Sequence, residues 1–306
     1  MRQLLICIVG PTAVGKTELG IQIAKDLNTE IISADSRQIY KGMSIGTAAP
    51  TADECAQVKH HFVNFLQPSE TYSAGDFERD TLDFLSEFFK THQVAVLVGG
   101  SGLYVKGVVD GFDKLPFNLD IRKELNARVN DGGLKSLADE LTTLDPEMAV
   151  NIDLQNTQRV VRALEVCLAS STTMTSFLNA TEIKNREFDI LQVGIEMPRD
   201  ELRERIEKRT HLMLEAGWVE EAKELLPYSH FNSLRTVGYN ELFSFLREEC
   251  SLAEAQEKIT IKTRQFAKRQ MTWFKKDSRV VWYEKKNIEG ALKFCLEFAA
   301  KYKTEA

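Results

Sequence analysis

Short apolar runs alternate with amphipathic stretches over the first hundred residues of the chain. LLICIV (4–9), EIISAD (30–35) and VAVLVGG (94–100) are apolar segments bounded by polar residues or glycine. Such runs are typical of strands buried on both faces of a parallel sheet. The intervening residues 15–27 and 73–90 carry helical spacing. Strands and helices in alternation predict an α/β fold, with a parallel sheet flanked by helices.

The pattern changes near residue 113. From there to residue 187 the segments are polar and helical, with breakers such as Asp131-Gly132-Gly133. ILQVGIE (190–196) then restores the strand pattern, and residues 280–283 offer a last strand. We therefore predict a discontinuous core domain of residues 1–112 and 188–306, and an inserted all-helical domain of residues 113–187.

Composition excludes several classes of protein. The chain has 306 residues with 43% hydrophobic and 27% charged content, which is ordinary for a globular protein. Its longest apolar run, Leu4 to Val9, is too short to cross a bilayer, so we expect no membrane association. Five widely spaced cysteines without a CxxC pair argue against a disulfide framework and favour the cytoplasm. A net charge of −6 still allows a local basic patch.

The first chemical motif lies between the first strand and the first helix. It reads GPTAVGKT and matches the P-loop pattern G-x-x-x-x-G-K-[ST]. Glycines let backbone N–H groups surround a phosphate, the lysine supplies a positive charge, and the last hydroxyl can bind Mg²⁺. An ordinary glycine-rich turn is the alternative, which the flanking strand and helix disfavour. The fold expected is therefore a P-loop NTPase-like core with a helical insertion. The residues predicted to bind a diphosphate or a nucleotide such as ATP are Gly10, Pro11, Thr12, Ala13, Val14, Gly15, Lys16 and Thr17.

The metal ligands are harder to assign. Many P-loop enzymes hold Mg²⁺ with an aspartate at the end of a buried strand, but VAVLV runs into Gly99-Gly100-Ser101-Gly102. We therefore expect Mg²⁺ on Thr17 and water, with Asp35 as a further candidate. Asp35 follows the second strand, at the edge where open α/β sheets bind ligands. The alternative is that Asp35 only caps a turn.

Two later segments carry charge in unusual places. Arg209 falls on the same helical stripe as Leu202 and Ile206, so it needs a partner, whereas Arg205 falls on a neighbouring stripe that we expect to face solvent. A structural salt bridge is the alternative for Arg209. Residues 258–276 hold seven Lys or Arg and no acid, with Ile259, Phe266, Trp273 and Phe274 on a different arc that we expect to pack on the core. The basic arc predicts binding to nucleic acid, and a solvated charged face is the alternative.

Together these segments resemble the tRNA dimethylallyltransferase (isopentenyl-tRNA transferase) family. The resemblance extends over almost the whole chain, and only its first block is generic. It implies transfer of a dimethylallyl group from its diphosphate to N6 of adenosine 37, beside the anticodon of tRNAs that read codons starting with U. The blocks are GPTAVGKT (10–17), SADSRQIYKGMSIGTAAP (33–50), VGGSGLY (98–104), RALEV (162–166) and TRQFAKRQMTWF (263–274).

The resemblance also implies roles for single residues. Asp35 would be the general base, Arg209 would engage the diphosphate, and Lys16 and Thr17 would complete the catalytic set, with Thr17 on Mg²⁺. Two departures are mild: GGSGLY replaces the family's GGTGLY, and Ser170 to Thr172 replace a common Thr-Gly. The expected tRNA contacts are Asp35, Ser36, Arg37, Gln38, Ser101, Arg122, Gln158, Arg159, Val160, Val161 and Arg162, to which the basic segment adds Lys268 and Arg269.

The chemistry of the expected reaction is consistent with these roles. A carboxylate can take the proton of the weakly nucleophilic adenine amine, while cations and Mg²⁺ stabilise the departing diphosphate. The base must leave its stack to reach the carboxylate, and the insertion would clamp the stem. We read His60 and His61 as structural or substrate-adjacent residues. The partners expected are tRNA and dimethylallyl diphosphate. The protein is expected to be a monomer and to be cytoplasmic. Two alternative functions remain: an isopentenyltransferase that acts on adenylate (AMP, ADP or ATP), and a P-loop kinase that acts on a small molecule.

Overall fold

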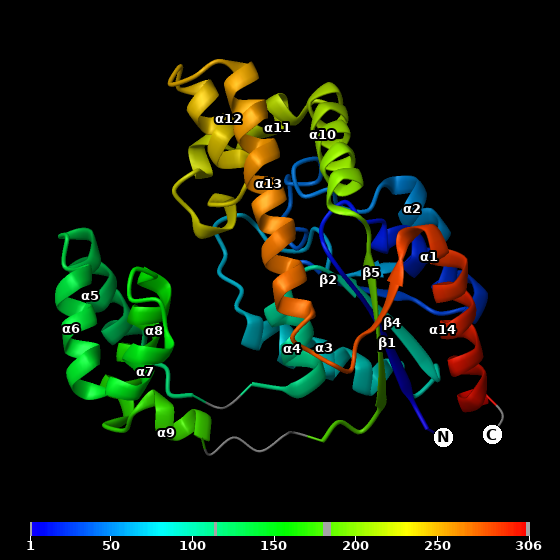
Figure 1. Ribbon diagram of the computed structural model, residues 1–306, viewed down its shortest axis with the longest axis horizontal. Coiled ribbons are helices and arrows are strands. Elements are labelled where there is room, and N and C mark those ends of the chain that lie inside the picture. Colours follow the sequence, from blue (N-terminus) through cyan, green and yellow to red (C-terminus); the bar gives the residue numbers. More distant parts are fainter. Residues whose placement is uncertain (1, 113–114, 180–184, 304–306) are drawn as a thin grey trace. The chain divides into compact units, whose positions relative to one another are not determined.

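The computed structural model describes residues 2–112, 115–179 and 185–303. Its sheet has the strand order β3-β2-β4-β1-β5-β6, with every neighbouring pair parallel (Figure 1). This confirms the predicted α/β parallel fold. The strands are β1 (Leu4–Val9), β2 (Ile31–Ala34), β3 (His60–His61), β4 (Val94–Gly99), β5 (Asp189–Glu196) and β6 (Val281–Glu284).

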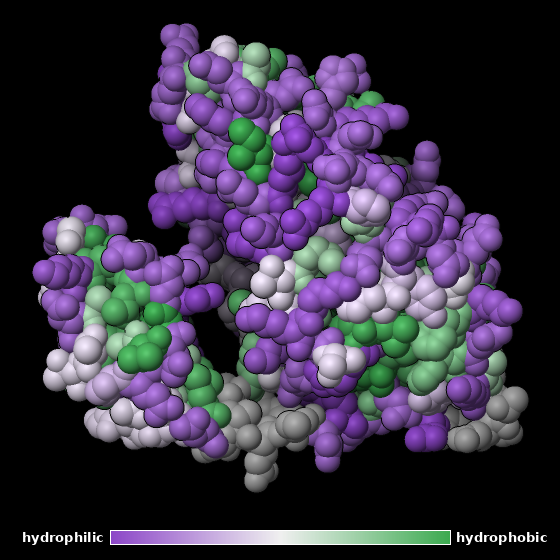
Figure 2. Space-filling model, viewed as in Figure 1, coloured by the Kyte–Doolittle hydropathy of each residue, from purple (hydrophilic) through white to green (hydrophobic). Residues whose placement is uncertain are grey.

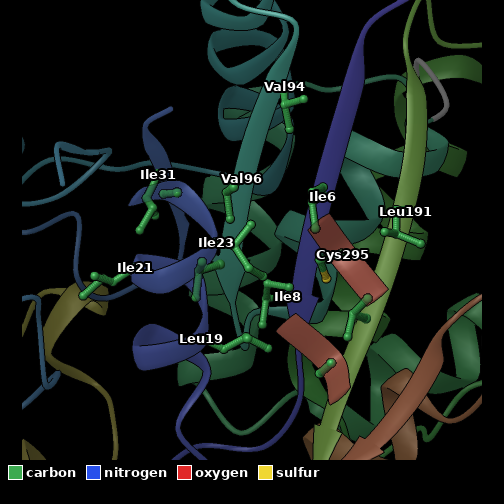
Figure 3. Packing of buried hydrophobic residues seen from close by; sticks show 14 of the residues in the cluster. Ile6, Ile8, Leu19, Ile21, Ile23, Ile31, Val94, Val96, Leu191 and Cys295 are labelled. Atoms are coloured by element: carbon green, nitrogen blue, oxygen red, sulfur yellow. The ribbon is translucent and has the colours of Figure 1, made fainter. Parts of the chain in front are cut away.

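Helices cover both faces of the sheet because the central strands are apolar on both sides. Along β1, Leu4, Ile6 and Ile8 pack into one core cluster, whereas Leu5, Cys7 and Val9 pack into the other, as the twofold period of a strand requires. The first cluster includes side chains of α1 (Lys16–Leu27) and α14 (Ile288–Lys303), and Figure 3 shows part of it. The second cluster includes side chains of α3 (Ala74–Phe88) and α4 (Gly102–Asp110).

Further helices of the core unit form a third cluster away from the sheet. Trp218, Tyr239 and Ile259 are buried there against Ile39 and Met43 of the segment after β2. This cluster positions the long helices that carry the expected diphosphate and RNA residues. The elements are α2 (Ala52–Gln57), which lies outside the cluster, and α10 (Arg199–Glu215), α11 (Trp218–Leu225), α12 (Tyr239–Leu246) and α13 (Leu252–Phe274).

The chain divides into two compact units. One unit comprises Met1–Asp110 and Asn185–Ala306, and the other comprises Gly111–Lys184. The first division lies two residues before the boundary expected from the sequence, and the second lies three residues before it. Residue 113, the expected first residue of the insertion, lies outside the described residues. The second unit has its own core, which includes Leu125, Leu141 and Leu164. Its helices are α5 (Leu119–Asn130), α6 (Leu134–Leu144), α7 (Pro146–Asn151), α8 (Thr157–Ser170) and α9 (Met174–Asn179).

No helix within the described residues is long and apolar enough to cross a membrane. On the face in Figure 2, hydrophilic side chains predominate over α12 and α13, while some apolar surface is exposed on the helical insertion. There, Phe117 and Leu119 are each 58% exposed.

Candidate active site

Glycine allows the P-loop to turn sharply after β1. Gly10 has a φ of +141°, and a Cβ at this position would lie 2.4 Å from the carbonyl oxygen of Ile195 in β5. Gly15, immediately before α1, has a φ of +101°. Neither conformation suits a residue with a side chain. The Lys16 Nζ donates a hydrogen bond to the Pro11 carbonyl across the loop (2.8 Å). The two glycines and this hydrogen bond give the loop a tight turn between β1 and α1, as expected of a phosphate-binding loop.

Residues of the P-loop line a pocket of about 440 Å³ at the carboxyl ends of the parallel strands. Four cations and a single carboxylate, Asp35, surround this pocket in the described structure. Such an excess of positive charge suits a polyanion. The cations are Lys16, Arg205, Lys208 and Arg209. Of the eight residues predicted from the motif, Thr12, Ala13, Gly15, Lys16 and Thr17 line the pocket, whereas Gly10, Pro11 and Val14 do not, and Val14 is fully buried in the core.

Lys16 and Arg209 are electrostatically coupled. Burial lowers the pKa of Lys16 to about 8, because it disfavours the charged form; Asp35 opposes this effect and Arg209 adds to it. Burial likewise lowers the pKa of Arg209, against the opposing effect of Asp35. The Arg209 Nη2 donates to the Thr12 hydroxyl (2.9 Å). Among the described residues no carboxylate lies within ion-pair distance of Arg209, so the salt-bridge alternative is not supported.

Asp35 follows β2 and serves partly as a turn cap. Its Oδ1 accepts hydrogen bonds from the backbone N–H groups of Arg37 (2.9 Å) and Gln38 (3.4 Å). Next to it, the Ser36 N–H donates to the Ser101 hydroxyl (2.9 Å), which joins the ends of β2 and β4. Gln38 also lines the pocket. The ends of β2 and β4 thus bring five of the predicted residues together. Asp35 caps a turn and also lines the pocket, so the two interpretations of this residue are compatible.

Sequence reasoning missed Gln270 of α13. This buried side chain accepts a hydrogen bond from the Thr12 N–H (2.8 Å) and donates one to the Gly100 carbonyl (2.9 Å). It therefore ties the P-loop to the loop after β4. Gly100 has no room for a side chain here, since a Cβ would lie 2.3 Å from the Gln270 Nε2. A glutamine at helical spacing gives no local signal of such a contact.

The expectation for Arg205 needs correction. The residue is exposed, but it does not simply face solvent: its Nε donates to the carbonyl of Ala13 in the P-loop (2.9 Å), and the side chain lines the pocket. Lys208, which sequence reasoning did not single out, lines the same pocket. Arg205 lies three residues before Lys208 and four before Arg209 on α10, so it shares a helix face with each of them.

The donors available to a metal are few. Thr17 and Asp35 both line the pocket and offer the oxygen atoms that Mg²⁺ prefers. Among the described residues, no three His, Cys, Asp or Glu side chains gather to hold a metal ion. His61 bonds to Glu30, whereas His60 lines the pocket and its pKa is lowered, chiefly by burial. The site therefore fits an Mg²⁺ ion held mainly by a bound diphosphate and water.

The basic segment at residues 258–276 has fewer unpaired cations than its sequence indicates. Three of its seven cations pair with acids from other elements: Lys262 with Glu241, Arg264 with Glu207 and Lys275 with Glu196. Lys268 and Arg269 remain exposed.

The aromatic arc of α13 also differs from the expectation. Phe274 and Ile259 are buried as expected, but Phe266 and Trp273 are 39% and 40% exposed, so the prediction that the whole arc packs on the core is wrong. The helix is buried along one face from Ala255 to Phe274, and these two rings lie at the edge of that face, where they remain partly exposed.

The insertion presents only part of its expected RNA segment. Gln158 and Arg159 are exposed at the start of α8, and Arg162 is half-buried. Val160 and Val161 are buried in the core of the insertion, and the tRNA contact expected for these two residues stays a prediction. Their positions follow from the helical period, which turns two residues of any such segment inward.

Comparison with known proteins gives a consistent result. A family model described as IPP transferase matches residues 38–277. The chain is 46% identical over 285 residues to a protein from Christiangramia forsetii named tRNA dimethylallyltransferase, covering 93% of this chain and 94% of that one. It is 43% identical over 284 residues to tRNA dimethylallyltransferase 1 of Phocaeicola vulgatus, with 92% and 94% coverage.

Solved structures show the same likeness. The tRNA isopentenylpyrophosphate transferase of Bacillus halodurans matches with a TM-score of 0.73 and 35% identity over 99% of both chains. A eukaryotic dimethylallyltransferase acting on tRNA matches with a TM-score of 0.79 over 92% of this chain and 74% of that one. At 24% identity this second match speaks for the fold alone.

Proposed function

The chain belongs to the tRNA dimethylallyltransferase family, and on that premise we propose how its own residues perform the transfer. Dimethylallyl diphosphate is the donor, and N6 of adenosine 37, beside the anticodon, is the acceptor. The tRNAs are those that read codons starting with U. The observation that carries this proposal is the P-loop pocket, which is lined by Lys16 and Arg209 and, as the one carboxylate among the described residues, by Asp35.

The cationic side of the pocket binds and stabilises the leaving group. As the allylic C–O bond breaks, negative charge grows on the diphosphate, and Lys16, Arg209 and backbone N–H groups of the P-loop would stabilise it. Groups arranged before the reaction stabilise such charge without having to reorganise. Arg205 and Lys208 extend the same surface and would contact the outer phosphate.

Asp35 acts on the other substrate. Its Oδ1 is held by two backbone N–H groups, which fixes the carboxylate at the end of β2. The carboxylate accepts a proton from the N6 amine as the new C–N bond forms, which general-base catalysis makes worth about 10²–10⁴ in rate. The Ser101 hydroxyl, which accepts a hydrogen bond from the neighbouring Ser36 N–H, would contact the adenine of the tRNA.

Mg²⁺ is the expected cofactor, with Thr17 as its protein ligand. The ion would neutralise part of the diphosphate charge when bound. The hydroxyl of Thr17 and the carboxylate of Asp35 line the same pocket, and both suit a hard cation.

The acceptor tRNA needs a larger surface than the pocket. Exposed Lys268 and Arg269 of α13 suit its phosphates, as do Arg122 and Arg159 of the insertion. Adenosine 37 must turn out of its stack to bring N6 to Asp35. We also propose that the protein is a monomer and that it works in the cytoplasm, where its five free cysteines stay reduced.

The decisive experiment offers two acceptors in parallel. Purified protein is incubated with Mg²⁺, dimethylallyl diphosphate and either an unmodified anticodon stem-loop or AMP, and the nucleosides are analysed by mass spectrometry. Gain of C5H8 on the adenosine beside the anticodon supports the proposal. Gain only on AMP would indicate an adenylate isopentenyltransferase, and ATP consumption without prenylation would indicate a kinase.

A matched variant tests the general base. Asp35→Asn keeps the shape of the side chain and removes its charge, so turnover should fall by about 10²–10⁴ while the affinity for the stem-loop changes little. Turnover within a few fold of wild type would exclude Asp35 as the base.

A further inference from the structure

The insertion contains a buried carboxylate to which the diphosphate site assigns no role. Glu165, in the middle of α8, is fully buried, although carboxylates are rarely buried without partners. It is surrounded by the core of the insertion, which includes Val161 and Leu164 on the same helix. A charge in such a place requires compensation.

Two arginines from different segments compensate this charge. The Glu165 Oε2 accepts hydrogen bonds from the Arg122 Nη2 of α5 and from the Arg162 Nη1 of α8, the latter at 2.6 Å. The Glu165 Oε1 accepts one from the backbone N–H of Asn118 (3.2 Å), which caps α5. Burial alone would raise the pKa of Glu165, but these hydrogen bonds lower it below its ordinary value. Glu165 is therefore ionised at neutral pH.

One carboxylate thus holds two guanidinium groups next to each other. Both bond the same oxygen, and without that charge they would repel and separate. The Arg162 Nη1 also donates to the Pro116 carbonyl (3.0 Å), and the Arg122 guanidinium lies over the exposed Phe117 ring, with its carbon 5.2 Å from the ring centroid. These contacts fix the orientation of both groups.

The two arginines nevertheless reach the surface. Their side chains are 37% and 29% exposed, for Arg122 and Arg162 respectively, while Glu165 is not exposed at all. The cluster carries a net charge of +1, and its negative partner lies on the inside. Each guanidinium offers five N–H donors in a plane, and the carboxylate uses only a few of them. The arrangement therefore presents paired, oriented donors to solvent.

We propose that Glu165 is a positioning residue for RNA: it holds Arg122 and Arg162 so that their outward N–H groups engage adjacent phosphate oxygens of the tRNA. The inference rests on the proposed function, since it requires these arginines to contact tRNA. Glu165 itself touches no substrate. It acts by fixing the geometry of a bidentate cationic pair, which would otherwise have to be ordered on binding.

The test separates RNA binding from diphosphate binding and chemistry. Full-length Glu165→Gln is assayed with an anticodon stem-loop and dimethylallyl diphosphate. We expect the KM for the stem-loop to rise about tenfold, while kcat and the KM for the diphosphate stay within about twofold. Glu140→Gln is the matched control, because Glu140 pairs with Arg128 in the same unit (2.6 Å) but is 30% exposed and contacts neither arginine. This control should leave all three constants within about twofold of wild type.

A double-variant cycle excludes a purely structural role. If Glu165 acts through the arginines, Glu165→Gln should raise the KM for the stem-loop no further when Arg122→Ala and Arg162→Ala are already present; an additive rise would contradict the proposal. If the arginine variants raise this KM and Glu165→Gln does not, the positioning role is wrong and the tRNA contact stands. If the arginine variants leave it unchanged, the proposed contact itself is wrong and the inference falls with it.

A second variant covers loss of folding. Removal of a buried charge can unfold the insertion, which a thermal melt detects. In that case Glu165→Asp is used instead, because it keeps the negative charge but moves it away from both arginines by the length of one methylene. The same selective rise in the KM for the stem-loop is expected, and an unchanged value would overturn the proposal.

Discussion

Replacement of Gln270 by leucine tests whether a single side chain of α13 holds the P-loop in its binding form. Leucine has nearly the volume of glutamine, so the change leaves little cavity. It removes both hydrogen bonds of the side chain: the one that the Gln270 Oε1 accepts from the Thr12 N–H (2.8 Å) and the one that the Gln270 Nε2 donates to the Gly100 carbonyl (2.9 Å). The two backbone groups then lose their partners at the centre of the site.

The magnitude follows from those two groups. A buried polar group left without a partner costs about 1–3 kcal/mol, so two would cost about 2–6 kcal/mol. Because the pocket beside them admits water, we expect a loss near the lower end, about 3 kcal/mol. Thr12 also receives the hydrogen bond of Arg209 (2.9 Å), so its displacement should disturb diphosphate binding. We expect the KM for dimethylallyl diphosphate to rise about tenfold, equivalent to about 1.4 kcal/mol.

Urea unfolding and steady-state kinetics measure the two effects. The three tryptophans, Trp218, Trp273 and Trp282, all belong to the core unit, so their fluorescence reports its unfolding rather than that of the insertion. The free energy of unfolding is obtained by linear extrapolation.

Gln192→Leu is the control for this prediction. Gln192 of β5 is also buried and donates to Asp277 (3.0 Å), but it does not line the pocket. The control should lose stability by about 1–3 kcal/mol and keep the KM for the diphosphate. The reasoning is refuted if Gln270→Leu unfolds within about 0.5 kcal/mol of wild type, or if its KM matches that of the control.

Two further predictions concern charge. Because the pKa of Lys16 is lowered to about 8, kcat/KM for dimethylallyl diphosphate should fall as the pH rises above about 8, measured with saturating stem-loop; a flat profile to pH 10 would contradict this. The free energy of unfolding should change in the opposite direction. Between about pH 8 and 10.5 the unfolded chain keeps the Lys16 proton whereas the folded chain has lost it, so stability rises with pH over this range. Urea unfolding at several pH values measures this. Replacement of Lys268 and Arg269 by glutamine should weaken stem-loop binding and lower the slope of log Kd against log salt by up to about 2, whereas an unchanged slope would place both residues away from RNA.

The sequence alone predicted most strands of the sheet and the phosphate loop, because their signals are local. The apolar run of β1 is followed directly by the glycines, lysine and hydroxyl of the loop, and the observed strand has the predicted bounds, Leu4–Val9. Parallel strands have their carboxyl ends at one edge of the sheet, and both Asp35 and Ser101 follow such an end. Topology alone therefore places these two residues at the same edge, where the Ser36 N–H bonds to the Ser101 hydroxyl. The short strand β3 and the helix α14 gave no such signal and were missed.

Tertiary structure decided which side chains reach the site and which carry free charge. Gln270 lies 258 positions from Thr12, and no pattern within a helix reveals a partner at that separation. The basic segment of α13 contains no acidic residue, but in the folded protein some of its cations pair with carboxylates of other elements, such as Glu241 of α12. In the insertion, Glu165 is buried and pairs with arginines of two helices. Periodicity specifies which face of an element turns inward, but the residues that meet there depend on how distant segments pack, and that packing is a property of the whole chain.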